Sequence, residues 1–499
     1  MDEDLDNKLA NIRKTDEIAG YLTSLYHLLM WDLWTCLPSE GIDYRERLAG
    51  FIAGEQYKNY CTKEIHEIVY YLENADNIKD VDKAIVRELK RNYELNVRVP
   101  YEKKMKLDEV CTKAQAAWKE AYEKSDFQIF RPYLEQIVNL NKEVADCIGY
   151  EGSRLNALIY RLEPGLDVER IEKLFTCLKV GIFDLLGKIE KSQIQIEPTL
   201  VNKNYSKQNL YRLSKYIVEK VGYNIEAGGY GESLHPFTSF IGPRDVRFTI
   251  NYNNFESSVL SALHEAGHAI YSQNGDDRLK YTGLWGGIMG FIHESQGRFF
   301  ENILGRSKEF WLYFYPYVQK ELEEFKSMEF EEFYKAINRV VPSFIRTDAD
   351  ELTYNIHAII RFEIEKDLFD DKIKIGDLPE VWNTKYKEYL GIEPASYREG
   401  ILQDMHWSMG LFGYFQSYAL GNIFGGQFFH RMKKDKPNIL HHVQNGDFKE
   451  VIYWLTENIY RYSKVYTPSE LIIKSTGEEL SSKYLLEYFN QKYSEIYCL

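Results

Sequence analysis

Apolar residues recur at helical spacing along most of the chain. The pattern in which positions i, i+3, i+4 and i+7 are apolar runs through residues 166–192 and 352–370. Only 13 prolines interrupt the 499 residues, and the sequence contains neither an internal repeat nor a low-complexity linker. The pattern predicts a mainly α-helical protein without a marked domain boundary.

Residues 228–253 interrupt this helical texture. Glycine and proline cluster there, and residues 246–250 have the composition of a strand. The alternation predicts a small β-element, with Asp245, Arg247 and Thr249 on one face and Val246, Phe248 and Ile250 on the other. A short exposed strand can pair with an extended peptide, whereas a packed hairpin without a ligand explains the same pattern.

Charge and cysteine usage narrow the class of protein. The chain has 62 basic and 76 acidic residues, a net charge of −14, and no basic stripe that would indicate a nucleic-acid partner. It has no apolar run of about 18 residues, so no membrane span is expected. Its first residues are acidic, unlike a signal peptide. The six cysteines are widely spaced, which favours free thiols and the cytoplasm.

Residues 264–268 read His-Glu-Ala-Gly-His. In a helix, a spacing of four residues puts His264 and His268 one turn apart on one face, where both imidazoles can bind the same zinc ion. Glu265 lies beside them and can act as general base toward the water that the metal activates. The apolar residues of 259–271 fall mainly on the opposite side, and an Asn-Gly pair then ends the segment. The alternative is a solvent-facing polar stripe with two incidental histidines.

A catalytic zinc site needs three protein ligands and one open position. A second helix is expected over residues 288–304, and it contains His293 and Glu294. Either side chain can bind a metal, but adjacent helical residues point about 100° apart, so only one of them faces the ion. The spacing favours Glu294 modestly, and the face that it occupies also carries glycines that would let the two helices approach closely.

Several further segments go beyond a general metallopeptidase pattern. In chain order they read WDLWTCLPSEG at 31–41, HPF at 235–237, DxRxT at 245–249, HESQGR at 293–298, IRTDAD at 345–350, GILQDMHW at 400–407 and FGYFQSYALGN at 412–422. Together with the HEAGH segment, in this order and spacing, they resemble the thermostable carboxypeptidase Taq family of zinc metallocarboxypeptidases. The resemblance spans about residues 31–430 and therefore covers most of the chain.

The resemblance implies a large helical fold, similar to that of neurolysin-like peptidases, with a deep central cleft. It implies a single domain over residues 1–499 with two helical halves around the cleft. It also implies one divalent metal per chain, zinc or cobalt, held by His264, His268 and Glu294, with Glu265 as the base. The expected protein is a homodimer that releases single C-terminal amino acids from peptides with broad specificity.

Two positions depart from the family pattern. Gly297 stands where the motif usually has serine, and Gln416-Ser417 stands where the family often has Pro-Thr. Neither change removes a catalytic group, so activity is expected, while substrate preference can differ.

Peptide hydrolysis also requires a hydrogen-bond donor for the oxyanion that forms in the reaction. His406 and Tyr418 lie in the matched C-terminal motifs and are the candidates for this role. Both residues also fit a purely structural role, with His406 as a hydrogen-bonded histidine and Tyr418 as an ordinary core aromatic. The chain has 39 tyrosines, so the type of residue alone does not single out Tyr418.

A free C-terminal carboxylate suits an arginine, because the planar guanidinium matches it with two hydrogen bonds. Arg346 is the first candidate and Arg247 the second. A structural salt bridge to Asp348 or Asp350 explains the presence of Arg346 nearly as well. His235 either contacts substrate or only orders the glycine-rich loop.

A metallocarboxypeptidase is favoured over two alternatives. An oligopeptidase would use the same zinc site to cut inside short peptides and would not need a free C-terminus. A catalytically inactive peptide-binding protein is disfavoured, because the base and the three candidate ligands are intact. The expected partners are peptides with a free C-terminus, and neither nucleic acid nor a membrane is expected.

Overall fold

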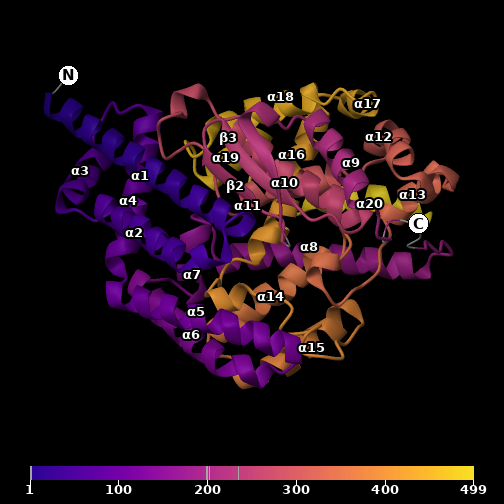
Figure 1. The fold of residues 1–499 in the computed structure, drawn as a ribbon, viewed down its shortest axis with the longest axis horizontal. Coiled ribbons are helices and arrows are strands. Elements are labelled where there is room, and N and C mark those ends of the chain that lie inside the picture. The colour runs from indigo at the N-terminus through magenta and orange to yellow at the C-terminus, as the bar shows by residue number, and fades with distance from the viewer. Residues whose placement is uncertain (1–2, 198–200, 202, 234) are drawn as a thin grey trace.

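A computed structural model describes residues 3–197, 201, 203–233 and 235–499. Within these residues, twenty α-helices surround one small sheet (Figure 1), so the predicted mainly α-helical fold is confirmed. None of the described helices combines the length and apolar composition that crossing a membrane requires. All six cysteines are free thiols.

In the part of the chain that the structure describes, nine helices precede the sheet. They are α1 (Glu3–Thr35), α2 (Ile42–Tyr60), α3 (Lys63–Glu73), α4 (Asp80–Arg98), α5 (Tyr101–Lys124), α6 (Phe127–Ile148), α7 (Leu155–Leu162), α8 (Val168–Lys191) and α9 (Lys207–Lys220). Helix α1 runs from the N-terminus toward the middle of the molecule (Figure 1), where it contacts the sheet. Helix α8 matches the helix expected over 166–192, and the side chain of Asp167 caps its N-terminus by accepting a hydrogen bond from the Arg170 amide.

The sheet has three strands in the order β1-β3-β2. Strand β1 (Gly228–Glu232) is parallel to β3 (Asp245–Ile250), and β2 (Thr238–Gly242) is antiparallel to it. The predicted β-element before the HEAGH segment is therefore confirmed. Val246, Phe248 and Ile250, which share one face of β3, are all buried. Thr249 on the other face is buried too, and its hydroxyl is hydrogen-bonded to the Ser233 hydroxyl and the Phe237 amide.

Eleven helices follow the sheet in the described chain. They are α10 (Ser261–Gln273), α11 (Phe291–Arg298), α12 (Lys308–Glu321), α13 (Phe330–Ile337), α14 (Tyr354–Phe369), α15 (Leu378–Leu390), α16 (Gln416–Asp435), α17 (Ile439–Gln444), α18 (Lys449–Asn458), α19 (Pro468–Thr476) and α20 (Lys483–Tyr497). Helix α11 continues into a π-helical turn over Phe299–Leu304. It begins later than the expected residue 288, because Gly290 adopts the left-handed conformation with φ 72°.

Glycines set the close packing of the three central helices. A Cβ atom on Gly267 of α10 would lie 2.5 Å from the carbonyl oxygen of Gln296, so the backbones of α10 and α11 touch there. A Cβ on Gly421 of α16 would lie 2.9 Å from Cγ of Glu294. Helix α11 is thus held between α10 and α16.

Two hydrophobic cores stabilise the chain. The larger core extends from Val99 to Tyr497 and includes α10, α11 and α16. The smaller core joins α1, α3 and α4 to residues 279–285. The description as one domain with two halves around a cleft stays a prediction.

Candidate metal centre and active site

Three side chains converge where α10 packs on α11. The Nε2 atoms of His264 and His268 lie 3.1 Å apart. They lie 4.0 and 3.8 Å from Oε2 of Glu294. Ligand atoms that surround a zinc ion tetrahedrally at about 2.0–2.1 Å lie roughly 3.3 Å from one another. The three predicted ligands therefore fit a divalent metal after small movements, and in the described residues they form the one group with this geometry.

The outer nitrogens of both histidines are held by other side chains. Nδ1 of His264 lies 2.8 Å from Oε2 of Glu301. Nδ1 of His268 lies 2.7 Å from Nδ1 of His293, whose Nε2 lies 3.3 Å from the Ser272 hydroxyl. These contacts turn both Nε2 atoms toward Glu294. His293 therefore lies behind a candidate ligand, and the geometry favours Glu294 as the third ligand.

Arg298 links the two carboxylates of this centre. Its Nε donates to Oε1 of Glu294 at 3.0 Å, and its Nη1 donates to Oε2 of Glu301 at 3.0 Å. Burial disfavours the charged Glu301 carboxylate, but Arg298 and His264 outweigh it and lower the pKa of Glu301 to about 2. Glu301 is thus an anion that orients His264.

Glu265 directly follows His264 in α10, and its side chain faces the sheet. The hydroxyl of Thr238 in β2 donates to Oε2 of Glu265 at 2.6 Å. The Glu265 side chain is nearly buried, and this burial raises its pKa, against the opposing effects of His264 and Thr238. A carboxylate with a raised pKa is a stronger base than an ordinary one, which favours proton transfer to it.

His406 and Tyr418 face each other across the C-terminal part of the site. Nε2 of His406 lies 3.1 Å from the Tyr418 hydroxyl, and no hydrogen-bond partner is recorded for its buried Nδ1. Burial lowers the pKa of His406 to about 4, so the imidazole is neutral at pH 7 and keeps one N–H. The Glu294 charge acts on Tyr418, one turn before Gly421, so this pair lies close to the candidate metal centre.

Arg346 is buried in a network behind Tyr418. Its Nε and Nη2 donate to Oδ1 of Asp404 at 3.1 and 2.9 Å, and its Nη1 donates to the Tyr354 hydroxyl at 2.7 Å. The guanidinium lies 4.6 Å from the ring centre of Tyr418. Asp404 also accepts from Nε of Arg361 at 2.6 Å. Arg346 thus forms a salt bridge, but with Asp404 and not with Asp348 or Asp350, so the alternative considered for it named the wrong partners.

Arg247 and His235 lie nearer to solvent. The Arg247 side chain is 32% exposed and donates to both oxygens of Asp245 at 2.8 Å. His235 is exposed and lines a cavity of about 950 Å³. The structure therefore separates these two from the buried network of Arg346.

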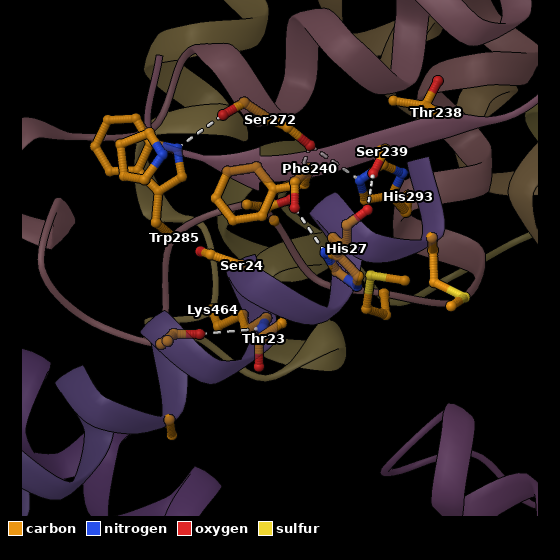
Figure 2. Close-up of a pocket in the computed structure, with 18 of the residues that line it drawn as sticks. Thr23, Ser24, His27, Thr238, Ser239, Phe240, Ser272, Trp285, His293 and Lys464 are labelled. Carbon is orange, nitrogen blue, oxygen red and sulfur yellow. Dashed lines mark hydrogen bonds between the residues drawn. The ribbon is translucent and has the colours of Figure 1, made fainter. Parts of the chain in front are cut away.

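This cavity, the main cavity, adjoins the candidate active site. Its lining includes Thr238, which holds Glu265, and His293, which supports His268 (Figure 2). Helix α1 also lines the cavity and contacts β2, where Nδ1 of His27 lies 2.6 Å from the carbonyl oxygen of Phe240. The edge of β2 is therefore already occupied at Phe240, which favours the packed alternative at that position over pairing with a peptide.

Sequence reasoning assigned no role to Thr238, Glu301 or Asp404. A signal was present for two of them, because Asp404 lies within the GILQDMHW segment and Glu301 follows Glu294 by seven residues on the same helical face. Thr238 directly follows the HPF segment, but its bond to Glu265 depends on how β2 packs against α10, which no local pattern shows.

Comparison with known proteins relates the whole chain to one family. The model of the carboxypeptidase Taq (M32) metallopeptidases matches residues 11–493. Carboxypeptidase 1 of Bacillus subtilis is 38% identical over 476 residues, which cover 95% of each chain. Thermostable carboxypeptidase 1 of Pyrococcus furiosus is 37% identical over 470 residues, which cover 93% of this chain and 94% of the relative. A solved structure of the Pyrococcus furiosus carboxypeptidase superimposes with a TM-score of 0.95 at 35% identity, over 99% of each chain.

Proposed function

The chain belongs to the carboxypeptidase Taq (M32) family of metallopeptidases, and we propose that it releases single C-terminal amino acids from peptides with broad specificity. Membership supports a metal-dependent carboxypeptidase. The observation that carries the finer proposal is the convergence of His264, His268 and Glu294 beside the carboxylate of Glu265. Two histidines and one glutamate are a donor set of catalytic zinc sites, so zinc is the proposed metal, with cobalt as the alternative.

Glu265 is the proposed general base. A bound zinc ion would supply Lewis acidity, which polarises the scissile carbonyl and makes water acidic enough to lose a proton. Glu265 takes that proton and passes it to the amine that leaves. The bond from Thr238 fixes one carboxylate oxygen, so the side chain does not have to reorganise before the transfer.

His406 and Tyr418 are the proposed donors to the oxyanion. Burial raises the pKa of Tyr418, so its hydroxyl keeps the proton that it can donate. Nε2 of His406 lies 3.1 Å from that hydroxyl. With its one N–H on Nε2, the neutral imidazole donates to the Tyr418 hydroxyl, whose own proton stays free for the oxyanion. His406 donates to the oxyanion itself when the substrate replaces this contact, and neither donor adds a permanent charge to the site.

Arg346 is the proposed recognition site for the substrate carboxylate. A guanidinium has five N–H donors, and three nitrogens of Arg346 are engaged with Asp404 and Tyr354. Arg346 and Arg361 together carry two positive charges against the one negative charge of Asp404. The cluster thus keeps one positive charge beside Tyr418 that can attract a carboxylate.

Arg247 and His235 are proposed as weaker substrate contacts. Asp245 already neutralises Arg247, while His235 is exposed at the main cavity. We also propose a homodimer in the cytoplasm, in line with the family resemblance and the six free thiols. Light scattering of the purified protein tests the dimer.

A pair of peptides tests the exopeptidase assignment. The peptides share one sequence, and one has a free C-terminus while the other is amidated. Leaving a buried cation unpaired costs about 3–5 kcal/mol, or roughly 10²- to 10⁴-fold in kcat/KM. The free peptide should be shortened one residue at a time, the amidated twin far more slowly, and an N-acetylated control as fast as the free peptide. Equal rates at internal bonds would instead identify an oligopeptidase.

A further inference from the structure

A second cavity, of about 810 Å³, lies next to the main cavity. It is formed by α4, by the end of α7 and by residues 464–468, and we call it the annex. Glu88, Asn92, Met289 and Lys464 line both cavities. The annex therefore continues the main cavity, which adjoins the candidate active site.

The annex is basic although the protein is acidic. Its lining contains three carboxylates and six cationic side chains, the latter being Lys83, Arg87, Lys90, Arg91, Arg161 and Lys464. The local excess is three positive charges, in a chain with a net charge of −14. A positive cavity inside a negative protein focuses the potential and concentrates anionic groups there.

The three carboxylates of the annex are already engaged. Glu73 accepts from Nζ of Lys90 at 2.5 and 2.7 Å. Glu88 lies 3.1 Å from Nε of Arg87 and 3.5 Å from Nη1 of Arg91. Glu94 also lies near Lys90, at 3.8 Å. The acidic groups of the cavity thus neutralise only part of its cations.

Three cations of the annex form no ion pair with the described residues. Within the described residues, no ion pair is recorded for Lys83 or for Arg161, and both side chains are exposed to the cavity. Lys464 donates to the carbonyl oxygen of Gly283 at 3.1 Å and forms no ion pair either. Nε of Arg91 is buried and has no hydrogen-bond acceptor. Lys83, Arg161 and Lys464 can therefore bind carboxylates that come from outside the protein.

We propose that the annex binds acidic side chains of the peptide substrate at a distance from the scissile bond. The proposal rests on the peptidase function proposed above. A peptide that lies in the main cavity can extend past Lys464 into the annex, because this residue lines both. The annex then selects peptides with glutamate or aspartate at one or two neighbouring positions. Arg161 contributes most, because it is exposed and its guanidinium can bind a carboxylate with two hydrogen bonds.

The test uses a neutral parent peptide and a series in which one glutamate replaces each position in turn. We measure kcat/KM with the full enzyme, and the affinity of the same peptides for Glu265→Gln, which does not depend on turnover. One position should favour glutamate by about threefold to tenfold. Arg161→Gln should remove most of this preference, and Arg161→Glu should reverse it, while the neutral parent is processed as before. Lys434→Gln is the control, since it removes one charge from an exposed lysine of α16 that does not line the annex.

Each other outcome has a distinct meaning. The proposal is wrong if no position favours glutamate, or if Arg161→Gln leaves the preference unchanged. It is also wrong if Arg161→Gln slows the neutral parent as much as the acidic peptides, because Arg161 would then support the fold. Failure to shorten the parent would instead refute the carboxypeptidase function, and the affinities would still decide for or against the annex.

Discussion

Removal of Arg346 should destabilise the protein measurably, whether or not the residue binds substrate. Its side chain is 7% exposed and forms three hydrogen bonds, two to Asp404 and one to Tyr354. Breaking a buried charge pair costs about 3–5 kcal/mol. Asp404 keeps the bond from Arg361 at 2.6 Å, so its charge is not left alone. We therefore expect Arg346→Ala to lower the free energy of unfolding by about 3 kcal/mol, the lower end of this range.

The assay combines unfolding with kinetics. Denaturant unfolding of Arg346→Ala, Asp404→Asn and the double variant gives the coupling energy of the pair. Arg247→Ala is the control, because its pair with Asp245 is about one-third exposed and should contribute no more than about 1 kcal/mol. A loss below about 1 kcal/mol for Arg346→Ala would refute the reasoning from burial. If Arg346 also binds the substrate carboxylate, the variant slows the free peptide and spares its amidated twin, whereas a purely structural role slows both equally.

Three further predictions concern the candidate metal centre and the pH dependence. Glu265→Gln should lower turnover by about 10²- to 10⁴-fold with metal still bound, and near-normal turnover would exclude Glu265 as the base. Glu294→Ala should lose its metal on dialysis, whereas His293→Ala should lose no more than about 10- to 100-fold in affinity for the metal. Metal analysis of both variants measures this difference. Metal loss from His293→Ala but not from Glu294→Ala would make His293 the ligand. Burial raises the pKa of Glu365 from 4.5 to about 8, so the folded protein holds a proton there that the unfolded chain releases. Stability from this group is present below pH 4.5 and is lost as pH rises toward 8, and Glu365→Gln should flatten that part of the unfolding profile; an unchanged profile would contradict the raised pKa.

Periodicity predicted the long elements well. The helices expected over 166–192 and 352–370 appear as Val168–Lys191 and Tyr354–Phe369. The end of α10 also agrees, since Asn274 follows its last residue. These features depend on local spacing and on capping residues, and both are visible in a sequence.

Long-range partners could not be predicted in this way. The alternative considered for Arg346 was a salt bridge to Asp348 or Asp350, because local reasoning can only compare near neighbours. In the structure, Asp350 instead accepts from the amides of Leu352 and Thr353, while the carboxylate that pairs with Arg346 comes from Asp404. The partner of Arg346 therefore depends on how distant segments pack. The sequence indicated the importance of Asp404 only through the motif that contains it.

The position of Arg298 bears on how the centre keeps one place open for water. The Nε2 atoms of His264 and His268 both lie within 4.0 Å of Oε2 of Glu294. Arg298 donates to the other oxygen, Oε1, at 3.0 Å. A carboxylate held in this way presents one oxygen to a metal, so it would take one coordination position and leave the fourth for water. Since Arg298 also binds Glu301, which orients His264, one buried cation positions two of the three candidate ligands.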